Sequence, residues 1–115
     1  MKLQLHGQHL RLRIDESELA ALHDGTTLEN ATRLGTVGWR QSLRLTQADE
    51  ASLQVGIGEC TIEIPQRLVE TYAARLPCRE GLALSLRAEG GPAVDFVLEV
   101  DIRDSVRSRG AVRRS

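Results

Sequence analysis

The stretch Leu10–Gly25, LRLRIDESELAALHDG, decides the fold. Its first five residues alternate leucine or isoleucine with arginine, which is the period of a half-buried β-strand. Asp15 follows, and its carboxylate can cap a helix by accepting a backbone hydrogen bond from two or three residues further on. Glu18 lies where it can return the bond to the Asp15 N–H and complete a capping box. The stretch therefore predicts a strand that leads directly into a helix, which Gly25 ends.

The residues before this helix predict a β-hairpin over residues 2–14. Leucines alternate on both sides of Gly7-Gln8 but with opposite parity, and a two-residue loop at that point repairs the parity. Leu5 then pairs with Leu10, and the leucines beyond them meet on the same face. Glycine at the first loop position suits a type II′ turn.

The rest of the chain continues in strands and one more helix. The pattern predicts a weaker strand over 26–34, a turn over 35–38, a strand over 39–46 and a hairpin over 53–64. A helix follows, with Pro65 at or just before its first position, and runs to Leu76, where Pro77 stops it. The last predicted element is a hairpin over 82–100. No internal repeat is evident. The predicted fold class is α+β: a mostly antiparallel, hairpin-linked sheet of about seven strands, curled toward a barrel, with two short helices that must pack on it.

Length and composition indicate one soluble domain. The chain has 115 residues, of which 41% are hydrophobic and 27% charged, and its net charge is −1. We predict a single domain over 1–102 and a basic, disordered tail over 103–115, which contains five arginines and one aspartate. Three aromatic residues cannot build a stacking platform for single-stranded nucleic acid, and the net charge favours neither nucleic acid nor a membrane.

The same features suggest a cytoplasmic protein. Cys60 and Cys78 do not make a disulfide framework, and Cys60 lies on the apolar side of a predicted strand, where a buried thiol is expected. No basic-then-apolar signal segment opens the sequence. No apolar run approaches the roughly 20 residues that a membrane helix needs.

Five arginines project from the polar face of the predicted sheet: Arg11, Arg13, Arg40, Arg44 and Arg87. Carboxylates, including Glu63, Asp95 and Glu99, share that face, so an ordinary solvated surface of cross-strand ion pairs is one interpretation. The other is a concave surface that binds an anion or a phosphate, because guanidinium groups match such oxygens with two parallel hydrogen bonds.

Two histidines flank the first predicted turn. In the hairpin, His6 and His9 lie directly opposite each other with Cβ atoms roughly 5 Å apart, which could hold two ligands of a metal ion. Such a site needs further ligands, for example His23 or Asp24, and nothing in the sequence places these together. Solvent-exposed turn histidines are the alternative.

The basic tail has two interpretations as well. It could contact nucleic acid or an acidic partner by releasing counterions, or it could act as a solubilising terminus.

Catalysis finds little support in the sequence. It contains no Gly-x-Ser-x-Gly, Walker loop, His-Glu-x-x-His or Cys-x-x-Cys motif. Gly56-Ile57-Gly58 follows a strand, but a strand rather than a helix comes next, so a phosphate cradle is not predicted. We assign no catalytic residue and no cofactor.

The opening MKLQLHGQHLRLRIDESE resembles the start of an uncharacterised family of small bacterial proteins. That family has a basic-apolar strand, a Gly-polar turn, Leu-Arg-Leu-Arg and a short Ser/Glu-rich helix there. Thr61–Pro65 and Leu98–Asp101 also fall where the family has similar segments. The resemblance covers most of residues 1–101 and implies no activity and no functional residues. The family's Lys-Asp, aromatic and Cys run near the C-terminus is replaced here by Val100–Arg103.

The sequence thus favours a non-catalytic binding or protein-interaction module. A homodimer or another protein is the expected partner, since exposed edge strands invite pairing. The alternatives are a small-molecule anion or phosphate binder, or an enzyme, that uses the arginine-rich face, and nucleic-acid contact through residues 103–115.

Overall fold

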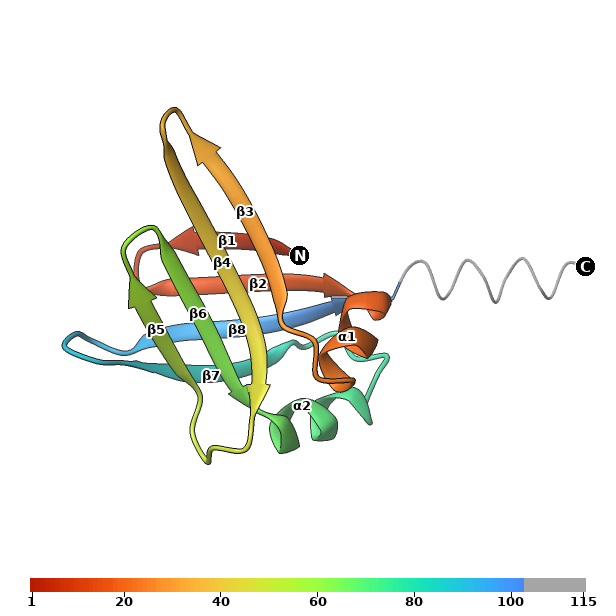
Figure 1. Cartoon of the computed structure of the whole chain (residues 1–115). Coiled ribbons are helices and arrows are strands. Elements are labelled where there is room, and N and C mark those ends of the chain that lie inside the picture. Colours follow the sequence, from red (N-terminus) through yellow and green to blue (C-terminus); the bar gives the residue numbers. More distant parts are fainter. Residues whose placement is uncertain (103–115) are drawn as a thin grey trace, which may run out of the picture.

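One curled, eight-stranded sheet forms a half-barrel, and two short helices lie together at one end of it (Figure 1). The computed structural model describes residues 1–102, so the basic tail predicted for 103–115 lies outside the described residues. The elements in chain order are β1 (Lys2–His6), β2 (His9–Asp15), α1 (Glu16–His23), β3 (Leu28–Leu34), β4 (Val37–Thr46), β5 (Ser52–Gly56), β6 (Glu59–Pro65), α2 (Gln66–Ala73), β7 (Leu82–Ala88) and β8 (Val94–Asp101).

The sheet is mixed, with the order β1-β2-β8-β7-β5-β6-β4-β3. Its four hairpins are antiparallel, as predicted, and the first has the predicted register, with Leu5 opposite Leu10. The hairpins join one another through parallel pairs, β2 with β8, β4 with β6, and β5 with β7. These parallel pairs join segments that are not hairpin neighbours, so local patterning does not reveal them.

The chain consists of two ββαββ units, a repeat that the sequence does not show. β5, β6 and α2 begin at Ser52, Glu59 and Gln66, each fifty residues after the first residue of β1, β2 and α1. The strand order reflects the repeat, because β1-β2-β8-β7 and β5-β6-β4-β3 are the same arrangement. The expectation of no repeat is therefore wrong at the level of structure. The units share buried positions, such as Leu12 and Ile62, rather than residue identities.

The apolar faces of the strands converge on one core. Leu12, Leu43, Ile62 and Phe96 are almost fully buried in a single cluster, and Leu84 packs against it. The helices close this core at one end, where Leu22 of α1 and Val69 of α2 are buried. The predicted separation of a leucine-, valine- and isoleucine-rich interior from a charged exterior is confirmed.

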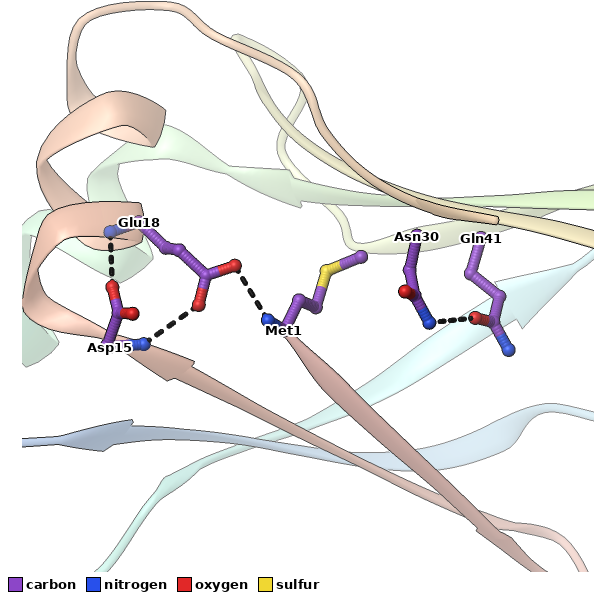
Figure 2. Close-up of polar contacts among 5 residues, drawn as sticks. All are labelled: Met1, Asp15, Glu18, Asn30 and Gln41. Carbon is purple, nitrogen blue, oxygen red and sulfur yellow. Dashed lines mark hydrogen bonds and ion pairs between the residues drawn. The ribbon is translucent and has the colours of Figure 1, made fainter. Parts of the chain in front are cut away.

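The start of α1 has the predicted capping box. The Glu18 N–H donates to Asp15 Oδ1 at 2.7 Å, and the Asp15 N–H donates to Glu18 Oε1 at 3.1 Å (Figure 2). The other oxygen of Glu18 lies 2.7 Å from the Met1 amino group, so this side chain links the helix to β1. α1 ends at His23, and Gly25 follows with a φ of +95°, as its role at the end of the helix requires.

Three predicted boundaries are wrong. The strand predicted over 26–34 begins only at Leu28. The turn predicted for 35–38 is restricted to two residues, because Val37 already belongs to β4. The second helix ends at Ala73 rather than at Leu76, although Pro65 precedes its first residue as expected. Beyond Ala73 the backbone N–H of Leu76 bonds to the Ala73 carbonyl, three residues back. This tighter turn fits the steric restriction that Pro77 imposes on the residue before it.

The capping box predicts a measurable contribution to stability. Asp15→Ala should lower the free energy of unfolding by about 1 kcal/mol, because the Glu18 N–H loses its acceptor. Asp15→Ser is the matched control: it removes the same charge but keeps a capping oxygen, so it should retain most of the stability. Urea unfolding followed by circular dichroism measures both. Equal losses in the two variants would show that the cap contributes nothing.

Candidate functional site

The five candidate arginines lie on the face of the sheet opposite the core, in separate groups. Arg11 and Arg13 belong to β2, Arg40 and Arg44 to β4, and Arg87 to β7. The sheet order places four strands between β2 and β4. The structure therefore places four of the arginines in two pairs, each on a single strand, and Arg87 by itself, and not all five in one cluster.

Carboxylates accompany most of these arginines. Arg11 Nε and Arg13 Nη2 lie 3.4 and 3.1 Å from the two oxygens of Glu99 on β8. Arg44 Nε donates to Glu63 on β6 at 2.9 Å. The outer surfaces of two of the three parallel strand pairs, β2 with β8 and β4 with β6, thus carry cross-strand ion pairs, with the arginines in the first unit and the glutamates in the second.

The remaining two arginines have a distant carboxylate partner or none within residues 1–102. Arg87 Nη1 is 3.5 Å from Glu50, with both side chains largely exposed. Arg40 makes no ion pair within residues 1–102. Exposed pairs of this kind contribute little to stability, so these arginines retain much of their capacity to bind another anion.

A groove of about 680 Å³ opens between the two edge strands, β1 and β3. Its lining residues are mostly polar: Met1, Lys2, Leu3, Gln4, Arg11, Arg13 and Asn30. Lys2 lies directly opposite Arg13 in the hairpin, a like-charge pairing that is unfavourable without an anion nearby. Glu99 pairs with the two arginines, whereas Lys2 makes no ion pair within residues 1–102.

The repeat supplies an internal comparison for this groove. In the second unit, the strands equivalent to β1 and β3 are β5 and β7, and the parallel pairs Ser52–Arg87 and Leu53–Ala88 join them. We call the place where β1 and β3 approach each other the open junction, and the paired β5 and β7 the closed junction. Fifty residues after Lys2, Arg11 and Arg13, the chain has Ser52, Thr61 and Glu63. Of these two junctions, therefore, the open one has the three cations on its first hairpin.

The inner side of the open junction is polar as well. On β3, Asn30 lies opposite Gln41 and donates a hydrogen bond to its Oε1 at 3.0 Å. The equivalent pair in the closed junction is Leu84 opposite Phe96. Figure 2 shows the Met1 side chain pointing toward Asn30 across the groove. The open junction is thus built from groups that tolerate water, which suits a binding groove.

Sequence reasoning found only part of this groove. It singled out Arg11 and Arg13 but neither Lys2 nor Asn30. The predicted hairpin register already implied that Lys2 faces Arg13, and this like-charge pair was the available signal. Asn30 could not be found in this way, because β1 and β3 are the two end strands of the sheet and only the curling of the sheet brings them near each other.

His6 and His9 lie opposite each other, as the predicted hairpin requires. His9 Nδ1 is 3.6 Å from Asp95 Oδ2, and both side chains are about two-thirds exposed. Over residues 1–102 no group of three or more histidine, cysteine, aspartate or glutamate side chains could hold a metal ion. A metal site at this histidine pair stays a prediction.

Burial changes the chemistry of two other groups. Cys60 is buried, as predicted, and desolvation raises the pKa of its thiol. Desolvation also raises the pKa of Tyr72, which a backbone hydrogen bond at Val100 partly offsets. Cys78 is only partly buried. Both cysteines are free thiols.

The two thiols should therefore react at different rates. In the folded protein at neutral pH, a water-soluble disulfide reagent should modify Cys78 and leave Cys60 intact, because burial hinders access and the raised pKa lowers the thiolate population. Unfolding in denaturant should release the second thiol. Absorbance at 412 nm with 5,5′-dithiobis(2-nitrobenzoate) counts the reacted groups, with Cys78→Ser as control. Two fast thiols in the folded protein would contradict the burial of Cys60.

No helix within residues 1–102 is long and apolar enough to cross a membrane.

Comparisons with known proteins give one match. Neither the curated proteins nor the solved structures include a match. A family model described as a family of unknown function (DUF7009) matches residues 1–104. This chain, with its α+β half-barrel, is therefore a member of this family.

Proposed function

We propose that this protein is a non-catalytic binding module that takes an acidic, extended segment of a partner protein into the groove between β1 and β3. One observation carries the proposal: Lys2, Arg11 and Arg13 line the junction that is open, whereas the closed junction has uncharged or acidic residues at the same positions. Positive charge at an open junction favours an anionic occupant.

The backbone of β1 supports an extended segment in particular. β1 is an end strand of the sheet, so one of its sides has no partner strand in the described chain. The two-residue turn makes His6 and His9 a hydrogen-bonded pair, and the alternation of an antiparallel ladder then directs the N–H and C=O groups of Leu3 and Leu5 outward. A peptide can add to such an edge as a further strand.

The side chains of β1 specify the pattern of that strand. Lys2 and Gln4 lie on the charged face, whereas Leu3 and Leu5 lie on the core face, where Leu5 is 64% exposed. Residues of an added strand would alternate between these two faces. The preferred segment therefore alternates acidic and apolar residues.

The groove favours binding over chemistry. None of its lining residues is a cysteine, a serine, a histidine or a carboxylate. Nucleophilic and acid–base catalysis use such side chains or a lysine, placed within hydrogen-bond reach of each other, and Lys2 has no second group of this kind beside it in the lining. The lining amides and cations are instead groups that hold an anionic ligand.

Fluorescence anisotropy with labelled peptides tests the proposal. A peptide that alternates glutamate and valine should bind more tightly than a peptide of the same composition with its glutamates in one block. Lys2→Glu should weaken binding of the alternating peptide by about tenfold or more, because it replaces an attraction by a repulsion. Arg40→Glu changes the charge by the same amount on a strand outside the groove and is the matched control.

The results separate this proposal from its alternative. Equal binding of the two peptides, or equal losses in Lys2→Glu and Arg40→Glu, would overturn it. Inorganic phosphate is tested in parallel by thermal shift at constant ionic strength. Stabilisation by phosphate that Arg13→Gln abolishes, together with no peptide binding, would overturn the protein-partner proposal in favour of a small-anion site.

A further inference from the structure

We propose that β3 pairs with β3 of a second copy of this chain, antiparallel and centred on Ala31, to form a homodimer with a continuous sheet. This interface uses the other edge of the same groove, which Asn30 of β3 lines, whereas the binding proposal above depends on the charges of β1 and β2, so separate variants test the two. β3 is the other end strand of the sheet, so its outer side has no partner within the described residues.

β3 lacks most of the features that usually protect an edge strand, although it carries the charged residues Glu29 and Arg33. It is seven residues long, its register with β4 is unbroken from Leu28 to Leu34, and it contains neither proline nor lysine. Proteins normally blunt such edges with short strands, bulges, prolines or lysines. An edge of this length and regularity can therefore accept another strand.

The sequence of β3 is complementary to itself in one antiparallel register. With Ala31 opposite Ala31 of the second copy, Glu29 faces Arg33 of the second copy, and Arg33 faces its Glu29. Neither Glu29 nor Arg33 makes an ion pair within residues 1–102. A two-fold axis through Ala31 creates both pairs at once, as an isologous interface requires.

The other face of the strand matches in the same register. Leu34, which is 64% exposed, would lie opposite the Leu28 of the second copy, and Asn30 opposite its Thr32. Apolar groups then meet apolar groups and polar groups meet polar ones. A shift by one residue would place each side chain opposite the wrong face, and a shift by two would keep the faces but lose both Glu29–Arg33 pairs.

The backbone is also in phase with this pairing. A two-residue turn separates Leu34 from Val37, which makes these two residues a hydrogen-bonded pair within the hairpin. The ladder alternates, so the N–H and C=O groups of Glu29, Ala31 and Arg33 are directed away from β4. These three residues are the ones that face each other across the proposed axis, and each pair can exchange two hydrogen bonds.

Charge exchange tests the dimer. Sedimentation equilibrium of the full chain, without peptide, should show a monomer–dimer equilibrium. Arg33→Glu should raise the dimer dissociation constant about tenfold or more, because it opposes two pairs of glutamates. Glu29→Arg should do the same. The double variant Glu29→Arg/Arg33→Glu restores both pairs with their signs exchanged, so it should recover the dimer.

Cysteine crosslinking tests the register. In a Cys78→Ser background, Ala31→Cys should form a disulfide-linked dimer, because hydrogen-bonded partners have Cα atoms about 5.5 Å apart, within disulfide range. Glu29→Cys and Arg33→Cys should each fail to crosslink with themselves. A mixture of these two variants should crosslink.

The outcomes are distinct from those of the peptide experiment. A chain that remains monomeric at the highest soluble concentration would overturn the proposal, as would self-crosslinking that is equally efficient at positions 29, 31 and 33. Failure of the double charge exchange to recover association would overturn it too. Lys2→Glu, which tests the groove, should leave the dimer dissociation constant unchanged, so the two proposals can fail separately.

Discussion

Neither ββαββ unit can bury its apolar face by itself, and this constraint shapes the whole molecule. The first hairpin of each unit pairs with the second hairpin of the other, β2 with β8 and β6 with β4. Leu12 and Ile62 therefore reach a common core only when the two units have interlocked. The parallel junctions and the shared interior follow from this exchange, as does the position of both helices at one end. The helices cap the core where the exchanged hairpins leave it uncovered.

Local patterns were sufficient to predict each element of this arrangement but not how the elements are joined. The strand-to-helix transition at Asp15 was predicted down to its hydrogen bonds, because a capping box is a contact between residues three positions apart. The register of the first hairpin followed from the two-residue loop. The pairing of β2 with β8 joins residues more than eighty positions apart, and no periodicity encodes it. The repeat was missed for a related reason, since burial is shared between the units while residue identity is not.

The same division applies to the candidate site. Arg11 and Arg13 were found because alternation places them opposite the core. Their neighbour Asn30 comes from β3, which only the curling of the sheet brings to the first hairpin. The conclusion that Arg11, Arg13 and Arg44 have carboxylate partners likewise required the strand order. Surface chemistry of this kind depends on long-range topology more than on any local motif.

The exchange of hairpins also has a consequence for synthesis and folding. The ladder between β2 and β8 ends with Asp15 beside Asp101, so strands from the two ends of the domain lie next to each other in the middle of one sheet half. During translation, almost the entire domain must be synthesised before β8, the second strand that pairs with β2, is available. Proteins dominated by such distant pairings fold slowly, because the entropy of closing a long loop is lost before the contacts form. A nascent chain of this protein thus exposes the leucine-rich side of its first hairpin until synthesis of the domain is nearly complete.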